Sequence, residues 1–209
     1  MTKGIFISIE GTDGSGKSTQ IELLKEYLAA KKVDSIFLRE PGGTEISEKI
    51  RDIILDVGNK GMSATTEMLL YAAARAQLMH EVILPGLSEG KTVVCDRFVD
   101  SSYAYQSFAR GLGIDAVRDA NRHAIAGVMP QMTLFFDISP QEALARRLSA
   151  TSADRLELEP EQFHIDVYNG YKVLAASEPE RIKVIDARRS IDEVATEVRA
   201  LIDGLLEMK

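Results

Sequence analysis

One eight-residue stretch constrains the fold of this chain more than any other. Gly11-Thr-Asp-Gly-Ser-Gly16-Lys17-Ser18 fits the phosphate-binding P-loop pattern G-x-x-x-x-G-K-[ST] at every fixed position. The apolar run at 5–9 predicts a buried strand before it, and Ile21, Leu24 and Leu28 follow at helical spacing. A strand, a glycine loop and a helix are the context that the pattern requires, because loop N–H groups and the helix N-terminus then face one anion. The alternative is a glycine-rich turn with an incidental Lys-Ser.

Strand and helix patterns alternate along all 209 residues. Such alternation predicts a parallel sheet with helices on both faces, because crossovers of this length connect parallel strands. We therefore expect one α/β domain spanning 1–209, a P-loop NTPase-like five-stranded parallel sheet with a small lid. The predicted strands are 5–9, 35–39, 92–96, 132–137 and 182–186, and the predicted helices are 18–31, 45–56, 65–84, 115–126, 140–149, 161–177 and 191–206.

The residues that follow the predicted strands carry the chemistry. In an open parallel sheet, ligands bind beyond the carboxyl ends of the strands, so these loops meet at one edge. Lys17 is expected to face the surface and to reach the β- and γ-phosphates of a nucleoside triphosphate, and Ser18 to offer its hydroxyl to Mg²⁺. Asp96 ends the third strand, the position from which a carboxylate supports that metal. A simple strand-ending Asp is the alternative.

Composition excludes several other classes. The net charge of −7 argues against a general nucleic-acid binder. The single cysteine, Cys95, lies in a buried-strand pattern and allows no internal disulfide, which suits a cytoplasmic location. The chain starts with a strand pattern instead of a signal peptide, and no apolar run approaches membrane-spanning length.

Several motifs, in order, make the chain resemble bacterial thymidylate kinase from about residue 4 to 187. Besides the P-loop they are Arg39-Glu-Pro-Gly-Gly-Thr44, Tyr71-Ala-Ala-Ala-Arg75, Asp96-Arg97-Phe98 with Ser102, Tyr105 and Gln106, and Asp154-Arg155-Leu-Glu157. The resemblance implies transfer of the γ-phosphate of ATP to dTMP, with Mg²⁺, by a homodimer formed through helices. It places ATP against Gly11, Thr12, Asp13, Gly14, Ser15, Gly16, Lys17, Ser18 and Thr19.

The same resemblance assigns the phosphate and sugar of dTMP. Arg97 and Arg51 would hold the acceptor phosphate, as a guanidinium can do in bidentate fashion, although a solvated surface arginine is the alternative for Arg51. Asp13 would accept the 3′-hydroxyl and align the acceptor arginine. Tyr105 would stand against the 2′ side of the sugar. Arg39 is expected to organise the Glu-Pro-Gly-Gly turn, with an approach to the acceptor phosphate as the alternative.

The base pocket is assigned in the same way. Tyr71 would stack on thymine and Arg75 would donate to its O4, since residues four apart share a helical face. Ser102 and Gln106 would line the base edge, and Glu40 completes the implied dTMP site. Without the resemblance, an aromatic on a helix is more often core, and Ser102 and Gln106 are more often a polar helix face.

The P-loop of this chain holds no arginine at its variable positions, Thr12 to Ser15. A catalytic arginine would then come from a lid at about 146–159, whose small polar residues suit a closing segment. Arg146 and Arg155 are the candidates, with Arg147 as a substitute. Together with Lys17, Asp13 and Arg97 they form the predicted catalytic set.

Two other classes stay open. One is another small P-loop kinase, acting on a different nucleoside monophosphate or a nucleoside. The other is a GTP-binding switch protein, although its guanine-reading N-K-x-D segment is missing: the only Asn-Lys is followed by Gly61-Met62. For the implied dimer, the apolar residues of 68–70 and 78–79 are the expected contributors.

Overall fold

In a computed structural model of the chain, which describes residues 4–146 and 154–207, a five-stranded parallel sheet forms the centre. The strand order is β2-β3-β1-β4-β5. The strands are β1 (Ile5–Glu10), β2 (Ser35–Arg39), β3 (Thr92–Asp96), β4 (Met132–Asp137) and β5 (Ile182–Asp186). All five lie where the sequence predicts them, β1 with one extra residue, and every pairing between neighbouring strands is parallel. The α/β class is confirmed.

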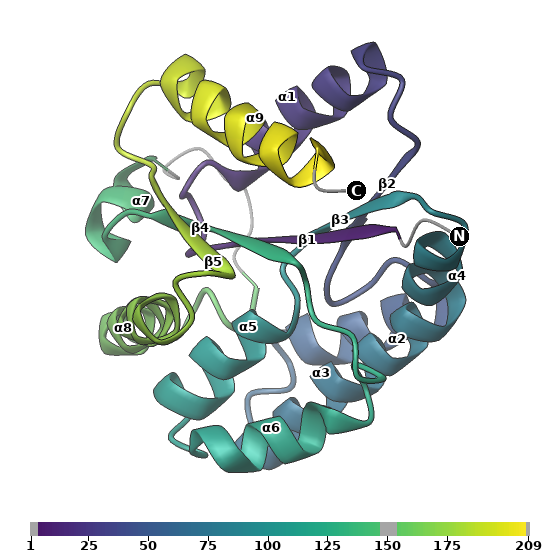
Figure 1. Cartoon of the computed structure of the whole chain (residues 1–209). Helices are drawn as coiled ribbons and strands as arrows, with labels where there is room; N and C mark the ends of the chain where they lie inside the picture. The colour runs from purple at the N-terminus through teal and green to yellow at the C-terminus, as the bar shows by residue number, and fades with distance from the viewer. Residues whose placement is uncertain (1–3, 147–153, 208–209) are drawn as a thin grey trace.

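Helices cover both faces of the sheet (Figure 1). One face carries α1 (Lys17–Ala30) and α9 (Ile191–Glu207), which pack on each other. The opposite face carries the other large helices, among them α3 and α8. The bounds of the remaining helices are α2 (Glu45–Leu55), α3 (Ala64–Leu78), α4 (Leu84–Ser88), α5 (Val99–Ser102), α6 (Ile114–Arg122), α7 (Pro140–Arg146) and α8 (Glu161–Ser177), with two π-helical segments, η1 (Met79–Ile83) and η2 (Tyr103–Ala109).

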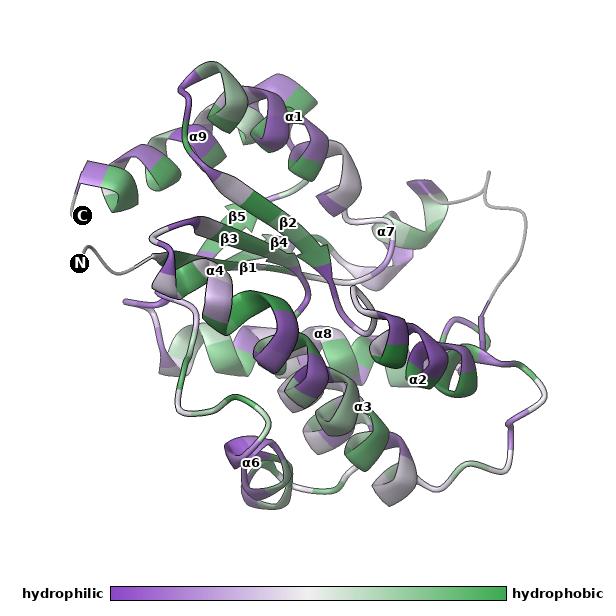
Figure 2. Ribbon diagram, turned by 90° about the vertical axis from the view of Figure 1, so that its right-hand side faces the viewer, coloured by the Kyte–Doolittle hydropathy of each residue, from purple (hydrophilic) through white to green (hydrophobic). Residues whose placement is uncertain are grey.

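The alternation of side chains along β1 divides the core into two. Ile5, Ile7 and Ile9 pack toward α1 and α9, whereas Phe6 packs with α3, η2 and α8 on the other side. Successive strand residues point to opposite faces, so Ser8 and Glu10 share the face of Phe6. The strands are mostly hydrophobic and the outer helices alternate between hydrophobic and hydrophilic residues (Figure 2). Both faces of the sheet are therefore buried, as expected for a parallel sheet.

Two predicted helices differ from the structure, and a third is described only in part. The helix predicted at 65–84 is divided by η1, just before Pro85. Proline has no N–H to donate and its ring crowds the carbonyl four residues earlier, so the backbone widens there. The predicted helix at 115–126 is replaced by α6, which ends at Arg122. The last three residues of the helix predicted at 140–149 lie outside the described residues.

The helical segment after β3 is the main element that the sequence did not predict. The sequence analysis placed 97–106 in a loop, but α5 and η2 make residues 99–109 helical. These residues pack closely against α8, which contributes Phe163, Val167 and Tyr171 to the same core. Aromatic and β-branched residues hide the helical preference in this stretch, and packing supplies it instead.

Two helix starts and the final helix agree with expectation. Ser139 and Glu142 form a capping pair at α7, and Ser190 and Glu193 do so at α9, each through a side chain that accepts from a main-chain N–H. Val194, Val198 and Ile202 of α9 are buried against the sheet. No helix among the described residues is long and apolar enough to cross a bilayer.

Candidate active site

A large cavity opens at the carboxyl ends of the strands. Its volume is about 910 Å³. The P-loop lines one part. Residues from the loops after β2 and β3 and from α2 and α3 line another, including Arg51, Tyr71 and Arg97. The cavity is therefore at the position where an open parallel sheet binds its ligands.

The P-loop has the backbone geometry that its glycines predict. Gly14 and Gly16 adopt φ values of 84° and 93°. A Cβ on Gly14 would lie 2.2 Å from the carbonyl oxygen of Ala143, so a side chain has neither the conformation nor the room. Within the described residues, the hydroxyls of Thr12 and Ser15 are buried without a hydrogen-bond partner. Buried polar groups are normally paired, so these hydroxyls fit a cradle for a polar ligand.

Lys17 differs from its predicted position. It was expected to face the surface, but only 6% of the residue is exposed. Its Nζ donates to the carbonyl oxygens of Gly11 and Thr12, at 3.0 and 2.9 Å. Burial lowers the pKa of Lys17 to about 8, with nearby Arg97 adding to the effect and Asp13 opposing it. An anion in the cradle would offset this burial, because an opposite charge favours the ammonium form.

The residues that the sequence assigns to Mg²⁺ fit that ion. Oδ1 of Asp96 is buried and has no hydrogen-bond partner in the described part of the chain, and Ser18 lines the same cavity. No three His, Cys, Asp or Glu side chains among the described residues are grouped to hold a metal. Mg²⁺ keeps several waters and takes one or two carboxylates plus substrate phosphates, so a lone carboxylate beside a hydroxyl suits it.

Arg97 is fixed beside the P-loop. Its Nη2 donates to Oδ1 of Asp13 at 2.7 Å, and its guanidinium carbon lies 5.4 Å from the centre of the Tyr105 ring. Asp13 thus holds one end of this guanidinium. The Arg97 backbone has a φ of 67°, in the left-handed region that a residue other than glycine seldom adopts. Such strain is found where the surroundings dictate one arrangement, and here it sits at the cavity.

The second arginine, Arg51, and the turn after β2 are both held by hydrogen bonds. Nη1 of Arg51 donates to the carbonyl oxygen of Pro41 at 2.8 Å, and burial lowers the pKa of Arg51. Arg51 is therefore held at the cavity and is not a solvated surface residue. Arg39 forms two hydrogen bonds with Glu48, whose Oε1 also accepts from the N–H of Gly43. Arg39 organises the turn.

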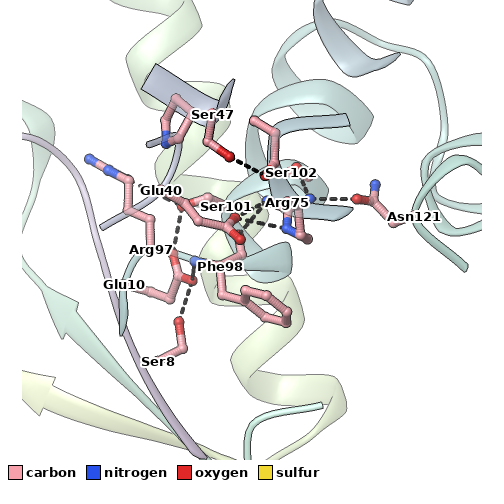
Figure 3. A network of polar contacts seen from close by, with 12 residues as sticks. Ser8, Glu10, Glu40, Ser47, Arg75, Arg97, Phe98, Ser101, Ser102 and Asn121 are labelled. Carbon is pink, nitrogen blue, oxygen red and sulfur yellow. Dashed lines mark hydrogen bonds and ion pairs between the residues drawn. The ribbon is translucent and has the colours of Figure 1, made fainter. Parts of the chain in front are cut away.

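Arg75 lies deeper than a base-contacting residue needs to be. It is 1% exposed and donates to Glu40, Ser102 and Asn121 and to the carbonyl oxygen of Phe98 (Figure 3). Its Nη2 is also 2.6 Å from Oε2 of Glu40. A guanidinium has five N–H groups, so a bound base would have to share one of these donors. The structure thus gives Arg75 a structural role that the sequence did not indicate.

Glu40 is the other half of this buried pair. Burial raises the pKa of Glu40 to about 7, and Arg75 opposes the rise. Oε1 of Glu40 is buried and lacks a hydrogen-bond partner among the described residues. One oxygen of Glu40 therefore holds Arg75, and the other is left for a ligand or a proton.

The remaining residues predicted for the base pocket line the cavity and differ in how deeply they are buried. Tyr71 is half-buried there, and burial raises the pKa of its hydroxyl, which therefore stays neutral at pH 7. Ser102 and Gln106 line the cavity but are buried, so they do not form a solvated polar face. The side-chain N–H of Gln106 donates to Glu67 at 3.0 Å.

The two lid arginines prove to be different. Arg146 lines the cavity, and its Nη1 donates to the carbonyl oxygen of Ala187 at 2.7 Å. Arg155, predicted as a mobile cation, is instead 7% exposed and donates to the carbonyl oxygen of Ile54 and to Glu67. Burial alone would raise the pKa of Glu67, but hydrogen bonds from Arg110 and Gln106 outweigh it, so a charged Glu67 binds Arg155. Residues 147–153 of the predicted lid, with Arg147, lie outside the described residues.

The sequence did not reveal the residues that form hydrogen bonds to the site residues and to their partners. They are Glu10, Ser101, Tyr171, Asn121 and Glu67, each of which donates to or accepts from a predicted site residue or its immediate partner. One signal was available: Ser8 and Glu10 alternate in a strand expected to be buried on both faces, where polar residues need partners. The others carry no local pattern.

A parallel sheet, a P-loop with a buried lysine, and arginines across one cavity define a P-loop phosphotransferase. The family is given by comparison: the model of the thymidylate kinase family matches residues 9–198. Thymidylate kinase of Symbiobacterium thermophilum is 50% identical over 202 residues, with 97% of this chain and 94% of the relative covered. That of Finegoldia magna is 53% identical over 190 residues, covering 91% and 93%. The chain belongs to the thymidylate kinase family.

A crystal structure supports the same assignment. Thymidylate kinase from Ehrlichia chaffeensis is 30% identical, has a TM-score of 0.78, and is covered over 96% of this chain and 99% of that one. Members of the family phosphorylate dTMP to dTDP with ATP.

Proposed function

We propose that this chain transfers the γ-phosphate of ATP to dTMP, giving ADP and dTDP, and that the residues described above carry the two substrates. The observation that carries the proposal is the continuous cavity, because the P-loop and Arg97 line one space. Transfer needs a donor and an acceptor phosphate held next to each other, with their repulsion offset by cations.

The donor half is the P-loop. The residues from Gly11 to Thr19 would hold the triphosphate, with Lys17 at the β- and γ-phosphates. Ser18 and Asp96 would hold Mg²⁺, which neutralises phosphate charge when bound. Lys17 is already directed at the loop by the carbonyl oxygens of Gly11 and Thr12.

The acceptor half is built from arginines. Arg97 and Arg51 would hold the phosphate of dTMP, and Arg146 would add charge to the transferred group. The acceptor phosphate has a second pKa of about 6, so it is largely dianionic at neutral pH and needs no general base. Positioning and electrostatic stabilisation are then the whole contribution of the protein.

The nucleoside would lie between Tyr71 and the group formed by Arg75 with its partners Glu40, Ser102 and Asn121. Tyr71 would stack on thymine, Asp13 would accept the 3′-hydroxyl, and Tyr105 would exclude a 2′-hydroxyl. Ser102, Gln106 and Arg75 would shape the base edge. Because Arg75 is engaged by Glu40, Ser102 and Asn121, its effect on the base is expected to be largely indirect.

We also propose a cytoplasmic homodimer formed through helices. Three residues named for the interface, Met68, Leu78 and Met79, are buried in the core of this chain and cannot contribute as expected. Leu69 on α3, which was also named for the interface, is half exposed. On the neighbouring helix α2, which packs on α3, Ile46 and Ile53 are half exposed as well. A solution mass near twice 23.0 kDa would support the dimer, and a mass near one chain would exclude it.

A coupled assay tests the reaction. It offers ATP or GTP as donor, and dTMP, dUMP, dCMP, AMP or GMP as acceptor, with Mg²⁺. We expect the highest kcat/KM for ATP with dTMP. A preference for another monophosphate or for a nucleoside would assign a different small kinase, and slow GTP hydrolysis without any acceptor would indicate the switch class.

A further inference from the structure

Behind the acceptor arginine lies a group of polar residues that the reaction does not contact. Glu10 is the last residue of β1, directly before the P-loop, and it is 0% exposed. It lies on the β1 face that carries Phe6 and Ser8, which is also the side of α5, η2 and α8. A carboxylate in such a place is stable only when its oxygens are paired.

The carboxylate of Glu10 accepts four hydrogen bonds. Oε1 accepts from the hydroxyl of Ser8 at 2.6 Å and from the main-chain N–H of Phe98 at 2.7 Å. Oε2 accepts from the hydroxyls of Ser101 and Tyr171, at 2.6 and 2.9 Å. A carboxylate offers about four acceptor sites, so Glu10 is saturated by protein donors. It is therefore not available to take a proton from a substrate.

Two of these donors also face Arg97. Its Nη1 donates to the hydroxyl oxygen of Tyr171 at 3.2 Å and to that of Ser101 at 3.4 Å. A hydroxyl has one proton and two acceptor sites. The two hydroxyls are also 2.7 Å apart and share a hydrogen bond, so their protons are directed at Glu10 and at each other. Lone pairs of both oxygens are therefore left to accept from the guanidinium. The other end of the guanidinium is held by Asp13.

Glu10 acts on the Arg97 backbone as well. The strained left-handed conformation of Arg97 is held between two contacts: its own N–H donates to the carbonyl oxygen of Ile9, and the next N–H, of Phe98, donates to Glu10. Figure 3 shows Glu10, Arg97, Phe98 and Ser101 together. The backbone and the side chain of Arg97 thus depend on the same carboxylate.

We propose that Glu10, Ser101 and Tyr171 form a positioning group that fixes the guanidinium of Arg97 for the phosphate of the acceptor nucleotide. The inference rests on the proposed function, because it takes Arg97 as the residue that holds this phosphate. Ser101 reaches the cavity lining, whereas Glu10 and Tyr171 are not part of it. The proposed contribution of the group is its hold on Arg97.

Tyr171→Phe is the sharpest test. The variant keeps the ring, which stacks on Phe135 with centroids 5.2 Å apart, and removes one of the two hydroxyls that join Glu10 to Arg97. We expect the Kd of dTMP to rise about three- to tenfold, the fold-change of one lost hydrogen bond. The Kd of thymidine, which has no phosphate, and the KM of ATP should not change.

Tyr168→Phe is the matched control. Tyr168 lies one turn earlier on α8, and its hydroxyl donates to Asp137, away from Arg97. Its loss should leave the Kd of dTMP unchanged. If Tyr171→Phe weakens dTMP and thymidine equally, or weakens neither, the positioning group has no role through Arg97 and the inference is wrong.

A double-variant cycle closes the argument. In an Arg97→Ala background, Tyr171→Phe should have no further effect on the Kd of dTMP. An undiminished effect in that background would overturn the inference. Ser101→Ala supplies the same test should Tyr171→Phe fail to fold. Failure of the proposed function would appear separately, as a wild-type protein that binds dTMP no more tightly than thymidine or does not phosphorylate it.

Discussion

The two halves of the cavity are built in different ways. The donor half is a contiguous loop, in which we propose that the backbone of Gly11 to Ser18 and the side chain of Lys17 bind the triphosphate. The acceptor half is assembled from side chains far apart in the sequence. Tyr71 and Arg75 lie on α3, whereas Arg97 follows β3. Glu40 accepts from Arg75, and Glu10 accepts from the N–H of Phe98, next to Arg97. The donor half needs local backbone geometry, whereas the acceptor half needs a correctly packed interior.

The largest expected effect is in the donor half. Lys17→Ala should lower kcat by about 10²–10³ or more, because it removes a charge aimed at the transferred phosphate. Steady-state kinetics measures the loss. Lys25→Ala, an exposed residue on the same helix, is the control and should keep wild-type kcat. Near-normal turnover of a folded Lys17→Ala protein would remove the P-loop from the mechanism.

The next effect tests the buried acceptor half through stability. Arg75→Ala should lower the free energy of unfolding by about 3–5 kcal/mol, because it leaves Glu40 buried without its partner. Denaturant titration measures this change. Arg188→Ala, which breaks an exposed pair with Asp186, should leave the unfolding midpoint unchanged. Equal midpoints for the two variants would mean that Arg75 does not organise the acceptor half.

The third test separates the two lid arginines. Arg146→Ala should lower kcat about ten- to a hundredfold, the loss of one charge-assisted contact, with an unchanged unfolding midpoint. Arg155→Ala should lower the midpoint instead, since Arg155 joins Glu67 to the end of α2. If Arg155→Ala lowers kcat in a protein of wild-type stability, Arg155 leaves Glu67 during the reaction and serves as the catalytic cation after all.

The smallest expected effect is the uptake of a fraction of a proton by Lys17 when ATP binds. The folded pKa of Lys17, about 8, is below its usual 10.5, so between these values the unfolded chain binds more protons and stability rises with pH. Bound phosphates would restore the ammonium. We therefore expect ATP binding at pH 8.5 to take up roughly 0.7 of a proton by this linkage, measured by calorimetry in buffers of different ionisation enthalpy. At pH 6.5 the uptake through Lys17 should vanish; equal uptake at both values would contradict the assignment.

The fold was largely predictable from local signals. All five strands lie at their predicted positions, because each is a short apolar run bounded by turn residues. The capping pairs at Ser139 and Ser190 marked two helix starts correctly. The helical stretch after Asp96 was missed, since its helical state depends on packing against α8 and not on its own sequence.

The site was predictable only in part. One cavity is lined by four of the predicted residues, namely Asp13, Arg51, Tyr71 and Arg97, as the motifs indicated. Their roles in binding stay predictions. Arg155 was interpreted as a mobile cation because its neighbours are small and polar, but its partner, Glu67, is 88 residues away. No pattern around Arg155 reveals that partner.

The sequence by itself determined the P-loop and the positions of the strands along the chain. A loop of glycines between a strand and a helix encodes its own geometry, and each strand is a short apolar run. Only the tertiary structure decided which buried carboxylate pairs with which arginine. Glu10 meets Tyr171 across 161 residues, and Glu40 meets Arg75 across 35. Hydrogen bonds and burial act between groups that are near in space, and distance along the chain does not report that nearness.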